Sequence, residues 1–223
     1  EIVEYIARRM KIDAASIFGK FDEITAGVER KLLEDALVRF VRIVMSHGIS
    51  RDVCKANPWE PSPTEGAIYN CFCELSSGLY SEKSRVVMDS LRHAFQNYAA
   101  GGLHQLFTGQ ECEGWYPKVV LDEVLEPNDI HTLPETIELY RGASIDELRN
   151  TMFGQSWSTS ESVAHDFAFT HYAFQPWFDK SERVVLKAAI SKGNVYFSNQ
   201  SDSECEVVVN VDKLYDVGVI YRG

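Results

Sequence analysis

The stretch Ser203–Val209, which reads Ser-Glu-Cys-Glu-Val-Val-Val, places two carboxylates one residue apart at the start of an apolar run. Such a run is typical of a buried strand, and side chains two positions apart on a strand point to the same side. Glu204 and Glu206 are therefore expected to lie close together, where like charges resist joint ionisation unless water or a cation compensates. A site that stabilises a positive transition state and then deprotonates an incoming group has a use for both. The alternative is an edge strand whose charges discourage pairing between molecules.

Two upstream segments favour the functional interpretation. Residues Ile137–Gly142 alternate in the manner of a short strand and end in Arg-Gly. Residues Trp157–Ser160 read Trp-Ser-Thr-Ser and lead into a helix expected over about 162–172, with Ser160 or Ser162 as its N-cap. Three candidate strands that carry polar or charged side chains thus follow one another in this part of the chain.

In this order, the three segments resemble the R-S-E class of mono-ADP-ribosyltransferases, the cholera-toxin-like family. That family carries an arginine on one strand, a Ser-Thr-Ser strand and a Glu-x-Glu strand, and the resemblance covers roughly residues 135–223. It implies an enzyme that splits the bond between nicotinamide and ribose in NAD and transfers ADP-ribose to an acceptor, without a metal. It also implies a bacterial toxin or effector, secreted or injected, that acts in the cytoplasm of a target cell; a cytoplasmic enzyme is the alternative.

The resemblance implies catalytic roles for Arg141, Ser158, Glu204 and Glu206. Glu206 would stabilise the charge that develops on the ribose, as a carboxylate does in glycoside hydrolysis. Ser158 would hydrogen-bond Glu206 and hold its orientation. Glu204 would orient or deprotonate the acceptor, and glutamate at both positions implies an arginine acceptor. Arg141 would bind the NAD phosphates, because its planar fork matches phosphate oxygens.

The resemblance also implies contacts with NAD beyond these catalytic residues. Gly142 lacks a Cβ, so a ligand can approach its backbone, and either Phe167 or Phe169 would lie against the nicotinamide ring; the alternative is that both phenylalanines are core residues. The full set implied to bind NAD is Arg141, Gly142, Ser158, Thr159, Phe167, Phe169 and Glu206. Relatives often carry a second phosphate-binding arginine three residues past the aromatic, where this chain has Thr170 or Tyr172. The candidates to replace it are Arg149, His171, Lys180 and Arg183.

Composition limits the partners. The 223 residues include 33 acids and 22 bases, a net charge of −11, which disfavours nucleic acid and anionic membranes and suits a basic protein acceptor. No run of 18 apolar residues is present, so no membrane span is expected. The chain begins at Glu1 rather than Met, and no signal peptide is expected within it; a trimmed chain or an excised domain is the alternative to a whole protein. Five cysteines favour free thiols, and Cys71 and Cys73 are expected in the core rather than on a metal.

The organisation predicts an α+β fold. Helices are expected over 20–47, 64–79 and 82–99 and strands over 137–141, 155–159, 183–190, 194–198, 205–209 and 214–221, with a further short strand at 118–121. A capping box, Ser144 to Glu147, is expected to open a short helix. We expect a mixed or antiparallel two-sheet catalytic core at residues 137–223, with a helical region at 1–136 packed on it to form one compact unit.

Two other functions remain open. One is an ADP-ribosyltransferase for a different acceptor, such as a threonine or nucleic acid, and the other is a catalytically idle binding module. The intact set of Arg141, Ser158 and Glu206 argues against an idle module, and the acidic charge argues against nucleic acid. The diphtheria-like class is disfavoured, because its first strand carries His where this chain has Arg141.

Overall fold

The structure is a computed structural model that describes residues 1–49, 61–110 and 115–223. The chain divides into two compact units, Glu1–Val120 and Leu121–Gly223. The division comes earlier than the expected boundary at residue 136, because Leu121 already belongs to the second unit: its N–H donates to Gln155 Oε1 at 2.9 Å and its carbonyl accepts from Gln155 Nε2 at 2.7 Å. The predicted α+β class is confirmed.

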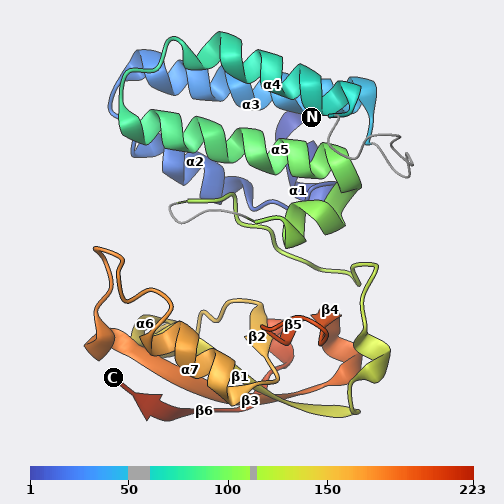
Figure 1. Ribbon diagram of the computed structural model, residues 1–223, viewed down its shortest axis with the longest axis vertical. Helices are drawn as coiled ribbons and strands as arrows, with labels where there is room; N and C mark the ends of the chain where they lie inside the picture. The colour runs from blue at the N-terminus through green and yellow to red at the C-terminus, as the bar shows by residue number, and fades with distance from the viewer. Residues whose placement is uncertain (50–60, 111–114) are drawn as a thin grey trace. The chain divides into compact units, whose positions relative to one another are not determined.

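The first unit is helical. Helices α3 (Gly27–His47), α4 (Pro63–Ser76) and α5 (Glu82–Thr108) pack side by side, with the shorter α1 (Ile2–Arg8) and α2 (Ala14–Asp22) against α3 (Figure 1). The helix expected over 20–47 is interrupted between α2 and α3. The short strand expected at 118–121 is reduced to one bridge between Val119 and Ile12.

The second unit is built on one antiparallel sheet of six strands in the order β4-β5-β2-β1-β3-β6. The strands are β1 (Thr136–Ser144), β2 (Ser156–Ser158), β3 (Arg183–Ser191), β4 (Val195–Asn199), β5 (Glu206–Val209) and β6 (Tyr215–Arg222). Each lies where the sequence predicted a strand. The expected division into two packed sheets is not confirmed, because β2 pairs with both β5 and β1 and so joins all six strands of the described residues.

The join between β1 and β2 is narrow. β1 and β3 pair continuously from Thr136 to Ser144, whereas β1 and β2 share the single pair Tyr140 and Ser158. The sheet therefore consists of two three-stranded halves, β4-β5-β2 and β1-β3-β6, that meet at one residue pair. Beyond Tyr140 the next residue of β1, Arg141, has no backbone partner on β2.

The two faces of the sheet carry different helices. Leu139 and Ala143 of β1 point into a core that includes Ile145 of the short helix α6 (Ile145–Arg149). The opposite face of β1 and β3 is covered by α7 (Glu161–Phe169), which contacts both strands (Figure 1). Because side chains alternate along a strand, Arg141 leaves the sheet on the α6 face and Gly142 lies on the α7 face.

Helix α7 rests directly on Gly142. A Cβ atom at this position would lie 2.4 Å from the carbonyl oxygen of Ala164 and 2.4 Å from the amide nitrogen of Ala168. Both atoms belong to the helix backbone and cannot move without moving α7. Helix packing thus accounts for the absent side chain. The expectation that a ligand approaches Gly142 on this side is wrong, because the backbone of α7 occupies the position of the missing Cβ.

We predict that Gly142→Ala lowers the free energy of unfolding of the second unit by about 2–3 kcal/mol, the cost of overpacking a close contact. Urea denaturation monitored by tryptophan fluorescence measures the change. Gly218→Ala is the matched control, since nothing lies within 4 Å of the position of its Cβ; its change should stay within about 0.5 kcal/mol. Equal stability of the two variants would contradict the role of Gly142.

Candidate functional site

Arg141 is held by a carboxylate and a carbonyl. Its Nε and Nη2 donate to Glu147 Oε2 and Oε1 at 2.9 and 3.1 Å, and its Nη1 donates to the backbone oxygen of Ser156 at 2.6 Å. The side chains of Arg141 and Glu147 are 22% and 24% exposed. This two-pronged pair fixes both the place and the plane of the guanidinium. One N–H on each terminal nitrogen is left over from these three bonds and can meet an anion.

Glu147 takes part in this pair instead of the expected capping box. The Ser144 hydroxyl does cap α6, but it accepts from the N–H of Asp146 at 3.2 Å. The Glu147 carboxylate turns back to Arg141 and also accepts the N–H of Gly154 at 3.1 Å. A Cβ on Gly154 would lie 2.5 Å from Arg141 Nη2, so glycine makes room for the guanidinium.

Arg183 is a second cation near this pair. Burial lowers the pKa of Arg183, and the nearby positive charge of Arg141 lowers it further. Glu147 and Tyr172 act in the opposite direction and raise the pKa of Arg183. Its Nε and Nη2 donate to the carbonyls of Ala168 and Phe167 at 3.2 and 3.3 Å, at the end of α7 where the helix dipole favours a positive charge. Two guanidinium groups and one carboxylate therefore leave the region net positive.

Of the four candidates for a second phosphate ligand, Arg183 fits this place. Arg149 instead pairs with Asp146 at 3.1 Å and Glu182 at 3.4 Å, and both of these pairs are exposed. Lys180 lies over the ring of Phe169, and the ring of His171 lies 4.7 Å from that of Phe167.

Glu206 is held by Ser156. The hydroxyl of Ser156 donates to Glu206 Oε1 at 2.6 Å. The expectation that Ser158 makes this bond is wrong, since its hydroxyl donates to the backbone oxygen of Glu204 at 2.7 Å and accepts the N–H of Ser160 at 3.0 Å. Ser158 faces Glu206 across the strands, but its single donor is drawn to the loop carbonyl, and the serine two residues earlier on the same face reaches the carboxylate.

The environment of Glu206 raises the pKa of its carboxyl group. Burial raises the pKa of Glu206, the hydrogen bond from Ser156 lowers it, and the charges of Glu204 and Asp202 raise it. In the part of the chain that the structure describes, no lysine or arginine forms an ion pair with this carboxylate. A carboxylate that is partly buried and not neutralised by a cation is suited to stabilising a positive charge that develops on a substrate.

Glu204 does not share the strand with Glu206. The strand β5 begins at Glu206, and Cys205 before it has a left-handed backbone with φ of 47°. The two-residue period therefore does not extend to Glu204, which is exposed on the preceding turn. Its charge still acts on Glu206, so the two carboxylates are neighbours at the mouth of the strand.

Thr159 ties the site to its surroundings. Its hydroxyl donates to Gln200 Oε1 at 2.6 Å, and Gln200 Nε2 donates to the backbone oxygen of Glu206 at 3.2 Å. The Thr159 N–H donates to the backbone oxygen of Cys205 at 3.2 Å. These bonds hold the end of β2 against the start of β5, so Thr159 has a structural task at the place where the resemblance implies contact with NAD.

The two candidate phenylalanines lie in different surroundings. Phe169 packs into a small core with Ala164, Ala168 and Val185, and its ring lies 4.9 Å from that of His165. Phe167 instead groups with His171 and with Tyr172, whose ring centroid is 6.2 Å away.

Phe167 is thus the candidate beside Arg183, since its own carbonyl accepts from Arg183 and its ring neighbour Tyr172 acts on the charge of Arg183.

Ser156 connects the arginine and the glutamate. Arg141 leaves the sheet on the α6 face, whereas Glu206, Ser158 and Tyr140 are cross-strand partners on the other face. The backbone carbonyl of Ser156 holds Arg141 and its hydroxyl holds Glu206. The residues that sequence reasoning missed are Glu147, whose position was interpreted as a helix cap, and Ser156, which precedes the recognised motif.

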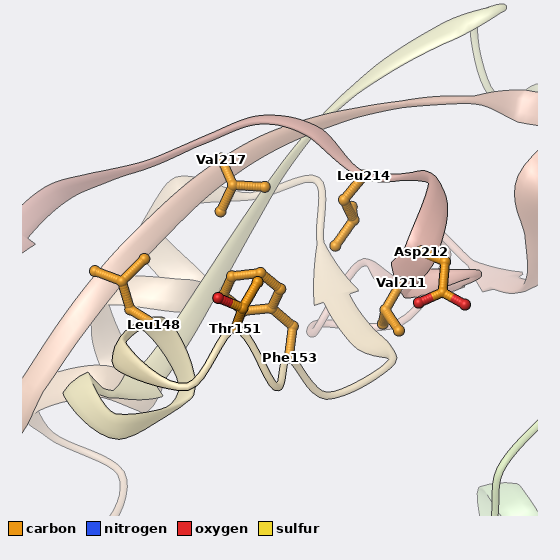
Figure 2. A pocket seen from close by; sticks show the side chains of 7 residues that line it. All are labelled: Leu148, Thr151, Phe153, Val211, Asp212, Leu214 and Val217. Atoms are coloured by element: carbon orange, nitrogen blue, oxygen red, sulfur yellow. The ribbon is translucent and has the colours of Figure 1, made fainter.

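A separate hollow of about 400 Å³ lies on the core side of the second unit, as Figure 2 shows. Val217 and Leu214 of the β6 side point toward Phe153 across it, and Asp212 lies at its rim (Figure 2). The remaining lining residues are Leu148, Thr151 and Val211. None of the residues expected to bind NAD lines this hollow.

Comparison of the chain with protein-family models, curated proteins and solved structures found no match. Within residues 1–49, 61–110 and 115–223, no helix is long and apolar enough to cross a membrane. Among the same residues, no three His, Cys, Asp or Glu side chains are grouped as ligands for a metal ion. Function is therefore inferred from the geometry and chemistry of the site residues.

We predict that Glu147→Gln destabilises the second unit by about 1–3 kcal/mol, because it leaves a mostly buried guanidinium without its charged partner. Chemical denaturation measures the loss. Glu182→Gln removes an exposed carboxylate that pairs with Arg149 at 3.4 Å and should cost less than about 1 kcal/mol. A Glu147 variant as stable as the Glu182 variant would show that the pair does not hold Arg141.

Proposed function

We propose that the chain is an NAD-dependent mono-ADP-ribosyltransferase that transfers ADP-ribose to a protein side chain, with arginine as the preferred acceptor. The observation that carries the proposal is the bonding of Arg141 and Glu206 to one residue, Ser156, at 2.6 Å each. A phosphate-binding cation on β1 and a charge-stabilising carboxylate on β5 are thereby both bound to β2, the strand that lies between them.

The reaction would break the bond between the ribose C1′ and the nicotinamide nitrogen, whose electron pair leaves with nicotinamide. The carboxylate of Glu206 would stabilise the positive charge that develops on the ribose. A nitrogen of the acceptor guanidinium then bonds to C1′ and loses a proton. Glu204, exposed on the turn next to Glu206, would accept that proton.

The residues near Arg141 fit the rest of NAD. One N–H remains on each terminal nitrogen of Arg141 beyond its bonds to Glu147 and Ser156, and Arg183 adds a second positive charge. Together they suit the two phosphates. Phe167, whose carbonyl accepts from Arg183, offers a ring for an electron-poor base.

The sheet itself supports the family-level fold in part. The family has a core of two packed sheets, and here the two halves of the sheet meet at the single pair of Tyr140 and Ser158. A small opening at this join would separate β4-β5-β2 from β1-β3-β6. We propose on this basis that the second unit is a variant of the ADP-ribosyltransferase core.

The acceptor is proposed to be a protein with a basic surface, because the chain is acidic at −11 and Asp202 and Glu204 lie together next to Glu206. Such an enzyme would act as a toxin or effector in the cytoplasm of a target cell. Treatment of a cell lysate with the protein and labelled NAD, followed by mass spectrometry, tests the acceptor. Label on arginine supports the proposal, whereas label on threonine or nucleic acid would favour the alternative acceptor, and no label at all would favour an idle module.

We predict that Glu206→Gln lowers the release of nicotinamide from NAD by about 10²–10³-fold, the scale for losing one group that stabilises the transition state. Chromatography of the released nicotinamide measures the rate. Glu138→Gln is the control, because Glu138 is an exposed glutamate of β1 that pairs with Lys187 at 2.6 Å, and it should keep the wild-type rate. A folded Glu206→Gln variant with unchanged turnover would contradict the catalytic role of Glu206.

We predict that Glu204→Gln separates the two half-reactions. Release of nicotinamide to water should persist, because Glu206 still faces the ribose. Transfer to agmatine, a small guanidinium acceptor, should fall by about 10²-fold or more, the scale for losing a general base. Mass spectrometry of ADP-ribosyl-agmatine measures transfer, and an equal loss of both activities would contradict the division of roles.

A further inference from the structure

We propose that Ser156, rather than the serine of the Ser-Thr-Ser motif, is the residue that positions both Arg141 and Glu206 for catalysis. The inference rests on the proposed function and assigns within it a role that the resemblance places on Ser158. Ser156 would touch neither NAD nor the acceptor; it would act by fixing the two groups that do.

The backbone direction of Ser156 determines which neighbouring strand its carbonyl points toward. The carbonyl of Gln155 accepts the N–H of Val209 at 3.0 Å, on the β5 side. Carbonyls alternate along a strand, so the carbonyl of Ser156 points to the β1 side. Ser156 is not among the residues that pair with β1, since β1 and β2 share the one pair of Tyr140 and Ser158 farther along. Arg141 Nη1 supplies the missing donor at 2.6 Å.

The side chain of Ser156 meets Glu206 from the same fixed backbone. Ser156 pairs with Val208 across β2 and β5, two residues from the pair of Ser158 and Glu206. Its hydroxyl donates to Glu206 Oε1 at 2.6 Å. A strand residue with pairing on one side and a guanidinium on the other has little freedom, so the carboxylate that it binds is held in one orientation.

Ser158 cannot do the same work in this arrangement. A hydroxyl has one hydrogen to donate, and that of Ser158 goes to the backbone oxygen of Glu204 at 2.7 Å. Its oxygen accepts the N–H of Ser160 at 3.0 Å, at the start of α7. Ser158 therefore anchors the turn and the helix, and a change there acts on the backbone rather than on the Glu206 carboxylate.

The two serines have different electrostatic consequences. Burial and the acids Glu204 and Asp202 raise the pKa of Glu206, and the bond from Ser156 is the one influence that lowers it. Glu206 has to be ionised to stabilise a positive charge, so activity is lost as the pH falls through its pKa. Removal of the Ser156 hydroxyl raises that pKa further, and the acidic limb of the pH–rate profile should then move to higher pH.

Three full-chain variants test the inference: Ser156→Ala, Ser156→Thr and Ser158→Ala. The pH dependence of nicotinamide release is measured for each, and the Glu206 carboxyl is titrated by ¹³C NMR with Glu206→Gln to assign its signal. We expect Ser156→Ala to lower kcat/KM by about 10–100-fold, the scale for losing a hydrogen bond to a charged group. Its acidic limb and its Glu206 titration should both move to higher pH.

The comparison variants make the outcome decisive. Ser156→Thr keeps the hydroxyl and should restore both pH values, and Ser158→Ala should leave both unmoved even if its rate falls. Unmoved titration in Ser156→Ala, or a shift in Ser158→Ala instead, would overturn the inference. If the wild-type protein releases no nicotinamide at any pH, the proposed function fails. The NMR titration then still decides whether Ser156 controls the ionisation of Glu206. Thermal unfolding shows which variants are folded.

Discussion

The second unit depends on the need to compensate the charge of Arg141. Its guanidinium is mostly covered, and a covered cation is costly unless carboxylate and carbonyl oxygens meet its N–H groups. Glu147 and Ser156 meet that need. The arrangement explains why the Glu147 carboxylate binds Arg141 and takes no part in capping α6. It also explains why residue 154 is a glycine, since a Cβ there would meet the guanidinium. One ionic contact thus ties β1 to α6, to the following loop and to β2.

The same contact shapes the sheet. The Arg141 side chain binds the carbonyl of Ser156 where β1 and β2 do not continue their pairing past Tyr140 and Ser158. The six strands remain one sheet, but the two halves meet at a single pair. The loss of backbone pairing at this point costs stability, and a fixed arginine side chain takes its place. Folding alone does not require such an exchange. Such a local departure from regular pairing marks the place where function is to be sought.

Glu206 has the opposite character. Arg141 is neutralised by a partner, whereas Glu206 is partly buried, is near two further acids and receives its support from one serine hydroxyl. A stable fold has little use for such a carboxylate, but a reaction with a positive transition state does. Arg141 is a cation with a charged partner, and Glu206 is a carboxylate without one, yet both bind Ser156. This contrast is the physical basis of the proposed chemistry.

The sequence pattern by itself determined the α+β class and the places of all six strands and of α7. The candidates Arg141 and Glu206 came from the resemblance of three ordered motifs to a known family. Only the tertiary structure decided the partners. Glu147 matched a helix cap in sequence, Ser158 matched the motif serine, and Glu204 matched the strand period. In the folded chain Glu147 instead binds the guanidinium of Arg141, Ser158 donates to the backbone oxygen of Glu204, and Glu204 lies on a turn before the left-handed backbone of Cys205. Side-chain partners depend on three-dimensional proximity, which a one-dimensional pattern does not contain.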